Sequence, residues 1–309
     1  MKRILVIPLI STRRFIWRES DYIVWLQFAR EWTDVTVYMI INEEAEIPDE
    51  CQLPNIVYVR VKHWYPYGSN QAMLSSELYE LFNPICGKYQ VDCILTSKNI
   101  VAANVKRLFE YSEVLRIPVI IGESWVPEPK DSNNVLEDKL KAVSYSECPT
   151  LFPTEREKKF AMRLSSKWLA GSSVRQAQAN ATVRSQGISA KRVQTIARSV
   201  EKFSQFTMTF AARFNSNKRW MEVLEAYENV HKMTGDVRIK AVYLSSSVDV
   251  DVVARFKKVE FIKPLPYSKY LELLGKSHMF VSMSMDENFS FGWAEQICTG
   301  NPILFPKQN

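Results

Sequence analysis

The chain has 309 residues, of which 46% are hydrophobic and 24% charged, and its formal net charge is +6. This balance is typical of a folded globular protein and excludes a disordered chain, while the length exceeds what one hydrophobic core usually supports and predicts two domains. No run approaches the roughly 18 apolar residues that cross a bilayer, and Arg13 and Arg14 follow the short apolar start of the chain, so we expect neither a signal peptide nor a membrane span.

The first 121 residues alternate between strand-like and helix-like runs. Residues 3–10 are almost all apolar, as in a strand buried on both faces, and Ser20 and Asp21 supply an N-cap for the next helix. Further strands are expected at 35–41, 56–61, 91–96 and 117–121, with helices at 71–82 and 101–111. The helix at 71–82 is expected to stop before Pro84. Such alternation predicts a parallel, doubly wound sheet, which binds ligands at the carboxyl ends of its strands.

The same alternation begins again in the last third of the chain. Residues 122–135 are rich in Gly, Pro, Ser and Asn and predict a long loop, and the elements between 137 and 200 have no clear boundaries. Strands are then expected at 206–212, 237–244, 259–262, 279–283 and 303–305, with helices at 220–232, 267–274 and 291–297. The pattern predicts an N-terminal domain of residues 1–200 and a C-terminal domain of residues 201–309.

Several classes of site are disfavoured by what the sequence lacks. It has no P-loop, no GxGxxG after the first strand, no GxSxG and no HExxH, and it contains only three histidines. The five cysteines are widely spaced without a CxxC pair, so neither a disulfide framework nor a zinc site is expected. Free thiols fit a reducing compartment, and we therefore expect a cytoplasmic protein with no metal.

The positive charge is concentrated in one segment. Residues 155–202 contain eleven Lys or Arg against three acidic residues, a local excess of +8. Such a stretch attracts anionic partners, and a membrane surface, a nucleic acid and a phosphorylated acceptor all remain open. Solvated helix faces would give the same pattern.

The residues that carry chemistry lie near the C-terminus. A strand ends at Met283, a short loop follows, and a helix begins near Phe291 and contains Glu295. The amides of Phe289, Ser290 and Phe291 would be unpaired donors at a helix N-terminus, where phosphate oxygens bind well. The carboxylate of Glu295 could accept both hydroxyls of a ribose. Together these features predict a nucleoside-diphosphate site.

This stretch resembles the E-x7-E element of the retaining glycosyltransferase family 4. Glu287 and Glu295 match the two glutamates of that element, and Phe289 matches its aromatic residue. Gly300, Pro302 and Ile303 match its G-x-P-V end. The departures are Asn288 and Ser290, which stand where glycines are usual, and Gln296, which replaces an alanine.

A second segment resembles the same family. Residues 206–218 are similar to its strand–G-R-x-x-x-x-K-G–helix element, in which the Arg and Lys clamp the donor diphosphate, and Arg213 and Lys218 fall on these two positions. Ala212 and Arg219 replace its glycines. Between the two motifs, residues 259–274 resemble the segment that touches the base, with the backbone of Ile262 facing it.

The resemblance implies a GT-B fold, with two Rossmann-like domains facing across a cleft and a C-terminal domain that is short or truncated. It implies transfer of a sugar, of hexose type, from a UDP- or GDP-linked donor to an acceptor hydroxyl, with retained configuration and without metal or cofactor. The catalytic residues would be Arg213, Lys218 and Glu287. The donor would be bound by Glu295, Asn288, Phe289, Ser290, Phe291 and Ile262, together with the loop residues Ser11 and Thr12.

Several points stay open at this stage. Many family members have an active-site histidine after the fifth strand, where this chain has Glu123, and Glu123 could take over part of that role. The acceptor could be a glycan, a lipid-linked molecule or a nucleic acid. Two rivals to the enzyme are a non-catalytic binding module of the same fold and a nucleic-acid-directed protein that uses residues 155–202.

Overall fold

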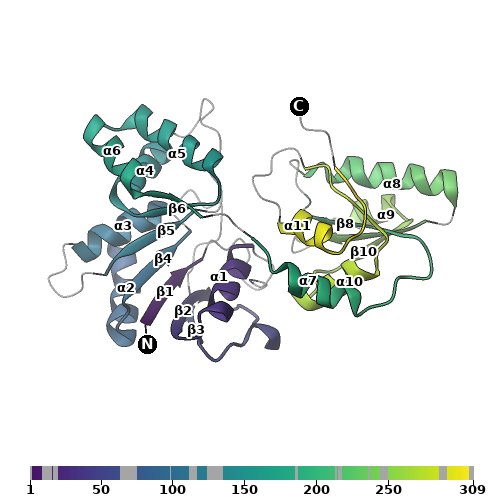
Figure 1. The fold of residues 1–309 in the computed structure, drawn as a ribbon, viewed down its shortest axis with the longest axis horizontal. Helices are drawn as coiled ribbons and strands as arrows, with labels where there is room; N and C mark the ends of the chain where they lie inside the picture. The colour runs from purple at the N-terminus through teal and green to yellow at the C-terminus, as the bar shows by residue number, and fades with distance from the viewer. Residues whose placement is uncertain are drawn as a thin grey trace. The chain divides into compact units, whose positions relative to one another are not determined.

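The computed structural model describes residues 2–8, 16, 20–62, 75–97, 99–110, 117–123, 135–184, 187–212, 214, 218–235, 237–243, 250–284 and 291–305. The chain forms two compact units, Met1–Gln186 and Gly187–Asn309. Each unit is a parallel sheet with helices (Figure 1). No helix in the described ranges is long and apolar enough to cross a membrane.

The first unit contains a seven-stranded sheet with the order β3-β2-β1-β4-β5-β6-β7. Its strands are β1 (Lys2–Ile7), β2 (Val35–Asn42), β3 (Ile56–Val61), β4 (Cys93–Thr96), β5 (Val119–Gly122), β6 (Thr150–Phe152) and β7 (Ala181–Val183). Its helices are α1 (Ser20–Glu31), α2 (Ser75–Tyr89), α3 (Asn99–Glu110), α4 (Val135–Glu147), α5 (Glu155–Trp168) and α6 (Gly171–Asn180). All neighbouring strands pair in parallel, as the alternation of runs predicts.

The apolar run of β1 explains why this sheet is covered on both faces. Leu5 and Ile7 belong to one hydrophobic cluster, which includes residues of α2, α3 and α4. Ile4 and Val6 belong to another cluster, which includes residues of α1. Because successive side chains of a strand point to opposite faces, an uninterrupted apolar strand needs two covering layers.

The prediction that a helix stops before Pro84 is wrong. Helix α2 runs on to Tyr89 and contains Pro84 in its interior. Pro84 is exposed, so its ring meets solvent, while Phe82 and Cys86 on either side are 1% and 0% exposed. Burying these side chains offsets the hydrogen bond that proline removes.

The second unit contains a five-stranded parallel sheet with the order β10-β9-β8-β11-β12. Its strands are β8 (Thr207–Ala212), β9 (Arg238–Tyr243), β10 (Val259–Ile262), β11 (Met279–Val281) and β12 (Ile303–Leu304). Its helices are α7 (Ala190–Arg198), α8 (Trp220–Thr234), α9 (Val250–Arg255), α10 (Tyr267–Lys276) and α11 (Phe291–Cys298).

Helix α7 belongs to this second unit, so the division between units lies before the boundary expected after residue 200. Val193 of α7 shares a hydrophobic cluster with Leu271 and Leu274 of α10 and Phe280 of β11. The two helices approach so closely that a Cβ on Gly275 would lie 2.6 Å from a backbone oxygen of α7. This packing fixes α7 against the sheet of the second unit.

Candidate functional site

The order of strands in the second sheet identifies its ligand-binding edge. From the central strand β8 the chain proceeds to β9 and β10 on one side and then to β11 and β12 on the other. Beta strands β8 and β11 are direct neighbours, with Met208 opposite Met279 and Thr209 opposite Phe280. In doubly wound sheets ligands bind at the carboxyl ends of the strands where the direction of winding changes. That point is the carboxyl edge between β8 and β11.

Both motifs recognised in the sequence leave the sheet at this edge. Arg213 follows the last residue of β8, and the segment that contains Glu287 follows β11 and leads into α11. Two motifs that are about 70 residues apart in the chain therefore start from adjacent strand ends. The side chains of Arg213, Glu287, Asn288, Phe289, Ser290, Ser11 and Thr12 lie outside the described residues.

Lys218 lies two residues before the start of α8 and is half-buried. The next residue, Arg219, is the N-cap of α8 and has a φ of 45° in the left-handed region. Glycine adopts this conformation freely, whereas other residues pay a steric cost in it. Arg219, which stands where the resembling motif has a glycine, therefore adopts a conformation that favours glycine.

Glu295 lies in α11 and is only 4% exposed. The hydroxyl of Tyr267, the first residue of α10, donates a 2.7 Å hydrogen bond to its Oε1. Tyr270 also forms a hydrogen bond to this carboxyl. Burial raises the pKa of Glu295 to about 7, against the lowering effect of these two hydrogen bonds. The carboxyl is thus oriented by two tyrosines and can change its charge near neutral pH.

The start of α11 is tied to the end of β11. Phe291 is the first helical residue, and the indole of Trp293 donates a 2.6 Å hydrogen bond to Oγ of Ser282, the residue after β11. Trp293 also stacks on Phe305 with ring centroids 5.5 Å apart. These contacts hold the first turn of α11 next to the switch point of the sheet.

Ile262 lies at the same edge of the sheet. It is the last residue of β10 and pairs with Val242 of β9, and β9 in turn pairs with β8. With about 4.8 Å between neighbouring strands, β10 lies roughly 10 Å from β8. The expected contact with a base and the expected contacts with a diphosphate therefore lie along one line of strand ends.

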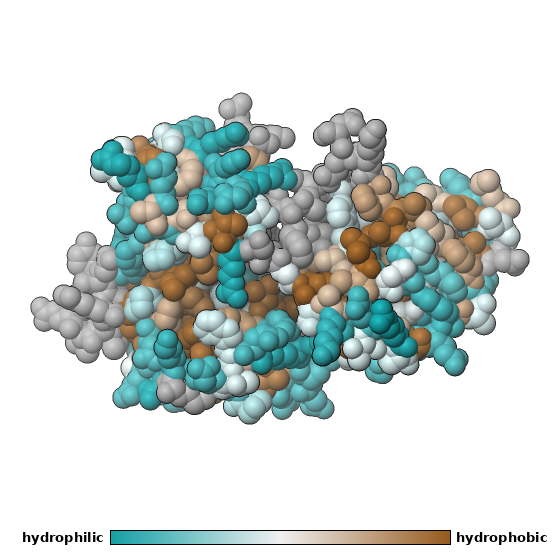
Figure 2. All heavy atoms as spheres, viewed as in Figure 1, coloured by the Kyte–Doolittle hydropathy of each residue, from teal (hydrophilic) through white to brown (hydrophobic). Residues whose placement is uncertain are grey.

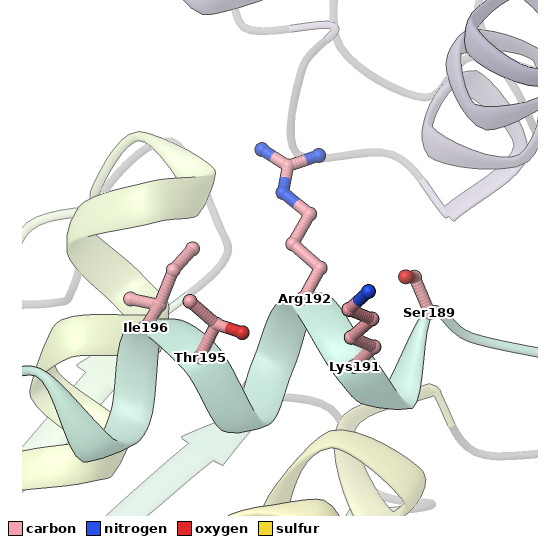
Figure 3. Close-up of a pocket in the computed structure, with 5 residues that line it drawn as sticks. All are labelled: Ser189, Lys191, Arg192, Thr195 and Ile196. Atoms are coloured by element: carbon pink, nitrogen blue, oxygen red, sulfur yellow. The ribbon is translucent and has the colours of Figure 1, made fainter.

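A hollow lies over one face of α7 and is lined by Ser189, Lys191, Arg192, Thr195 and Ile196 (Figure 3). Arg192 extends away from the helix axis in this view. Its guanidinium lies 5.3 Å from the centroid of the Tyr267 ring, the same residue that holds Glu295. A cation over an aromatic face is attractive, so Arg192 supports the position of Tyr267.

The first unit has its own switch point, between β1 and β4. Buried polar side chains gather at the carboxyl ends beside it. Ser97, which follows β4, donates a 2.6 Å hydrogen bond to Asp21 of α1. Glu123, which follows β5, is 7% exposed and is bonded to Asn99 and Tyr145.

No family model matches the sequence, and no curated protein matches it. Solved structures match the fold over nearly the whole chain. A sucrose-phosphate synthase from Thermosynechococcus elongatus has a TM-score of 0.69 at 13% identity, over 99% of this chain and 81% of that chain. A glycosyltransferase from Rickettsia africae has a TM-score of 0.62 at 13% identity, over 98% and 79% of the two chains. A UDP-forming alpha,alpha-trehalose-phosphate synthase from Burkholderia vietnamiensis has 0.65 at 11% identity, over 97% and 82%.

The chain has the GT-B fold. At these low identities the similarity concerns the architecture, two Rossmann-like units in tandem, and it does not single out glycosyltransferase family 4 among GT-B proteins. In the ranges that the structure describes, no group of three His, Cys, Asp or Glu residues is placed to hold a metal ion.

Sequence reasoning missed the residues that orient the two buried carboxyls of this GT-B chain. Tyr267 and Tyr270 lie 28 and 25 positions before Glu295, and Asn99 and Tyr145 lie on either side of Glu123 at similar separations. No local pattern connects such residues. The sequence contains one signal for two of these residues. The first residue of a helix that follows a strand lies at the ligand-binding edge of an α/β sheet. Tyr267 and Asn99 both occupy this position.

The basic segment 155–202 is divided between the two units. Helix α5, in the first unit, carries four exposed cations at helical spacing, namely Arg156, Lys159, Arg163 and Lys167. Most of the visible surface over α5 and α6 is hydrophilic (Figure 2). The cations of α7 belong to the second unit and include Arg192 of the hollow. The positive charge that is continuous in the sequence is therefore shared between two separate units.

Proposed function

We propose that this chain is a retaining glycosyltransferase, which moves a hexose-type sugar from a nucleoside-diphosphate donor to an acceptor hydroxyl. One observation carries the proposal. The Arg213–Lys218 segment and the Glu287–Glu295 segment leave the second sheet from the neighbouring strands β8 and β11, at the carboxyl edge where the winding changes direction. The GT-B fold, which this chain shares with known sugar-nucleotide enzymes, supports the same proposal.

Charge stabilisation at the leaving diphosphate is the main task of such a site. Arg213 offers a planar pair of donors to phosphate oxygens, and Lys218 offers a compact positive charge. The backbone amides at the start of α11 add donors beside the positive end of a helix dipole. Fixed groups of this kind lower the barrier because they are already oriented when negative charge develops. The proposal needs neither a metal nor an organic cofactor.

The resemblance to glycosyltransferase family 4 suggests the remaining donor contacts. Glu295 would accept hydrogen bonds from the ribose hydroxyls, Glu287 would orient the sugar, and the backbone of Ile262 would face the base. Asn288, Phe289 and Ser290 would surround the diphosphate. A solved protein of the same fold is a UDP-forming enzyme, which favours UDP over GDP as the carrier.

The acceptor belongs to the first unit in this proposal, with the loop that contains Ser11 and Thr12 contributing to the site. Glycans and lipid-linked acceptors both present the required hydroxyl. The free cysteines agree with a cytoplasmic location.

Donor binding tests the proposal directly. Calorimetry with UDP-glucose, UDP-galactose, UDP-N-acetylglucosamine and GDP-mannose should find one donor that binds wild-type protein, and Arg213→Ala and Glu295→Gln should each weaken it by about tenfold to a hundredfold, as expected for charge-assisted hydrogen bonds. Lys257→Ala, which removes an exposed cation of the same unit, is the control and should bind normally. If Arg213→Ala and Glu295→Gln bind every donor as tightly as wild type, the proposal is wrong.

The departures at Asn288 and Ser290 favour one alternative, a binding module of the same fold without turnover. Release of nucleoside diphosphate from the bound donor distinguishes the two. Turnover that Arg213→Ala abolishes supports the enzyme, whereas tight binding with no turnover toward any hydroxyl acceptor supports the module. The anomeric proton coupling of the product, measured by NMR, then tests retention of configuration.

A further inference from the structure

Gln296 is a departure from the resembling motif that the proposed donor contacts leave unexplained. It follows Glu295 in α11 and stands where the motif has an alanine. The side chain is long and polar, yet it is only 2% exposed. Its Oε1 has no hydrogen-bond partner among the residues that the structure describes. A buried acceptor without a partner is destabilising, and an alanine would avoid it, so the other end of the amide is where a role is to be sought.

The other end of the Gln296 amide contacts Tyr270 of α10. A hydrogen bond joins the Gln296 side chain to the Tyr270 hydroxyl. Because Oε1 lacks a partner, this bond comes from Nε2, which donates to the phenolic oxygen. The Tyr270 hydroxyl in turn forms a hydrogen bond to the Glu295 carboxyl. Three side chains from two helices therefore form one chain of hydrogen bonds, which ends at the carboxyl that is proposed to bind the ribose.

The single proton of the Tyr270 hydroxyl gives this chain a direction. A phenol that accepts from Nε2 keeps its own proton for another acceptor, and an ionised carboxyl is a stronger acceptor than an amide oxygen. In the inverted orientation of the amide, Oε1 of Gln296 would gain a partner, but it would compete with Glu295 for that proton. The orientation in the structure leaves Oε1 without a partner and directs the Tyr270 proton to Glu295.

Two tyrosines of α10 hold the Glu295 carboxyl, and each has a third side chain behind it. Tyr267 donates to Oε1 of Glu295 at 2.7 Å, and the guanidinium of Arg192, from α7, lies 5.3 Å from the centroid of the Tyr267 ring. Tyr270 forms the second arm, with Gln296 behind it. Burial raises the pKa of Glu295 to about 7, and the hydrogen bonds from the two tyrosines oppose this effect. Each arm therefore stabilises the ionised form of the carboxyl.

We propose that Gln296 is a positioning residue of the donor site, whose Nε2 holds the Tyr270 hydroxyl in the orientation that donates to Glu295. It acts through Tyr270 and touches neither the donor nor the reacting atoms. Without the amide, the hydroxyl is free to turn away from Glu295, so the ionised carboxyl loses part of its stabilisation and accepts ribose hydroxyls less well. The effect on donor affinity rests on the proposed function above, whereas the effect on Glu295 does not.

NMR of protein labelled with ¹³C at the glutamate side-chain carboxyls measures the ionisation of Glu295 without any ligand, and Glu295→Gln assigns the signal. Gln296→Met removes the amide but keeps the length of the side chain, and it should raise the pKa of Glu295 by about 0.5–1. Gln194→Met, at a partly buried glutamine of α7 in the same unit, is the matched control and should leave this pKa unchanged. An unchanged pKa in Gln296→Met overturns the proposal.

A double-mutant cycle separates the route through Tyr270 from a general disturbance of α11. Tyr270→Phe should itself raise the pKa of Glu295, because it removes one of the two donors. If Gln296 acts through that hydroxyl, adding Gln296→Met to Tyr270→Phe should raise the pKa no further. An equal shift by Gln296→Met in both backgrounds would show a purely structural role and overturn the proposal. Gln296→Ala, which introduces the usual residue of the motif, replaces Gln296→Met in the cycle if thermal unfolding shows that the methionine variant folds poorly.

Donor affinity then tests the consequence for the proposed function. With a sugar nucleotide that binds wild type, Gln296→Met should weaken binding about twofold to fivefold at pH 7 and by less than about twofold at pH 8.5, where Glu295 is ionised in both proteins. If wild type binds no sugar nucleotide, the proposed function fails, and the NMR titration still decides the role of Gln296. If donors bind and Glu295→Gln weakens them, but Gln296→Met changes neither the pKa of Glu295 nor the affinity, the role of Gln296 fails alone.

Discussion

The hydroxyl of Tyr267 lies 2.7 Å from Oε1 of Glu295 and links the first residue of α10 to a buried carboxyl of α11. This hydrogen bond stabilises the charged form of Glu295 and so lowers its pKa, although burial keeps the pKa raised to about 7. An ionised carboxylate is the better acceptor for ribose hydroxyls. Donor affinity should therefore depend on the ionisation of Glu295 and on the tyrosine that orients it.

Tyr267→Phe should raise the pKa of Glu295 and weaken donor binding at pH 7 by about tenfold, with a smaller loss at pH 8.5, where the carboxyl ionises in either protein. Calorimetric titrations of one donor between pH 6 and 8.5 measure this effect. The matched control is Tyr227→Phe in α8, whose buried hydroxyl has no hydrogen-bond partner among the described residues. Equal pH profiles for wild type and Tyr267→Phe would contradict the prediction.

The pKa values of Glu123 and Glu295 also predict how stability depends on pH. Both are raised from 4.5 to about 7 in the folded protein, so between these values the folded state binds more protons than the unfolded state. The stability linked to each group is fully present below pH 4.5 and is lost as the pH rises through 7. From the size of each pKa shift, each group lowers the free energy of unfolding by about 3 kcal/mol at alkaline pH relative to pH values below 4.5.

Glu123→Gln removes one of these groups. The free energy of unfolding of the variant, minus that of wild type, should increase as the pH rises from 5 to 8, because only wild type must ionise a buried carboxyl. Thermal unfolding of both proteins over this range gives the difference, in which all other titrating groups cancel. A difference that stays constant with pH would mean that Glu123 has an ordinary pKa.

How far the sequence predicts this structure depends on the length and regularity of each run. Strands β3 and β10 have the predicted bounds because their runs are compact and bordered by polar residues. Strands β6 and β7 have three residues each, too few to give a recognisable period, so the sequence predicts short strands in residues 137–200 without their bounds. Helix α2 passes through Pro84 because tertiary burial outweighs the local preference.

The residues of the candidate site also differ in how far the sequence predicts them. Motif spacing leads from the sequence to Lys218 and Glu295, and the fold brings their segments to adjacent strand ends. The partners Tyr267, Asn99 and Tyr145 are determined by packing of helices that no spacing rule connects. Arg219 shows a third case, since its residue type does not predict its left-handed φ of 45°.

Two helical glycines should respond in opposite ways to replacement by alanine, because only one of them lies at a close helix contact. A Cβ on Gly275 would lie 2.6 Å and 2.7 Å from backbone atoms of Ala197, so Gly275→Ala must push the helices apart and should destabilise the second unit by about 1–3 kcal/mol. Gly87 is an exposed residue within α2, and a Cβ added there would meet nothing within 4 Å. Gly87→Ala should stabilise by about 0.5–1 kcal/mol, since alanine favours helix. Denaturant unfolding measures both, and a Gly275→Ala protein as stable as wild type would contradict the packing argument.

The exposed cations of α5 predict a directed affinity for polyanions. Arg156, Lys159, Arg163 and Lys167 repeat every three or four residues and so lie along one side of the helix, where their fields add. Lys159→Glu with Lys167→Glu should lower the salt concentration at which the protein elutes from heparin, because binding to a polyanion releases counterions in proportion to the contacts made. Lys257→Glu with Lys258→Glu changes the net charge equally on exposed residues of the second unit and should shift elution less. Equal shifts for the two double variants would mean that net charge, and not the face of α5, governs polyanion binding.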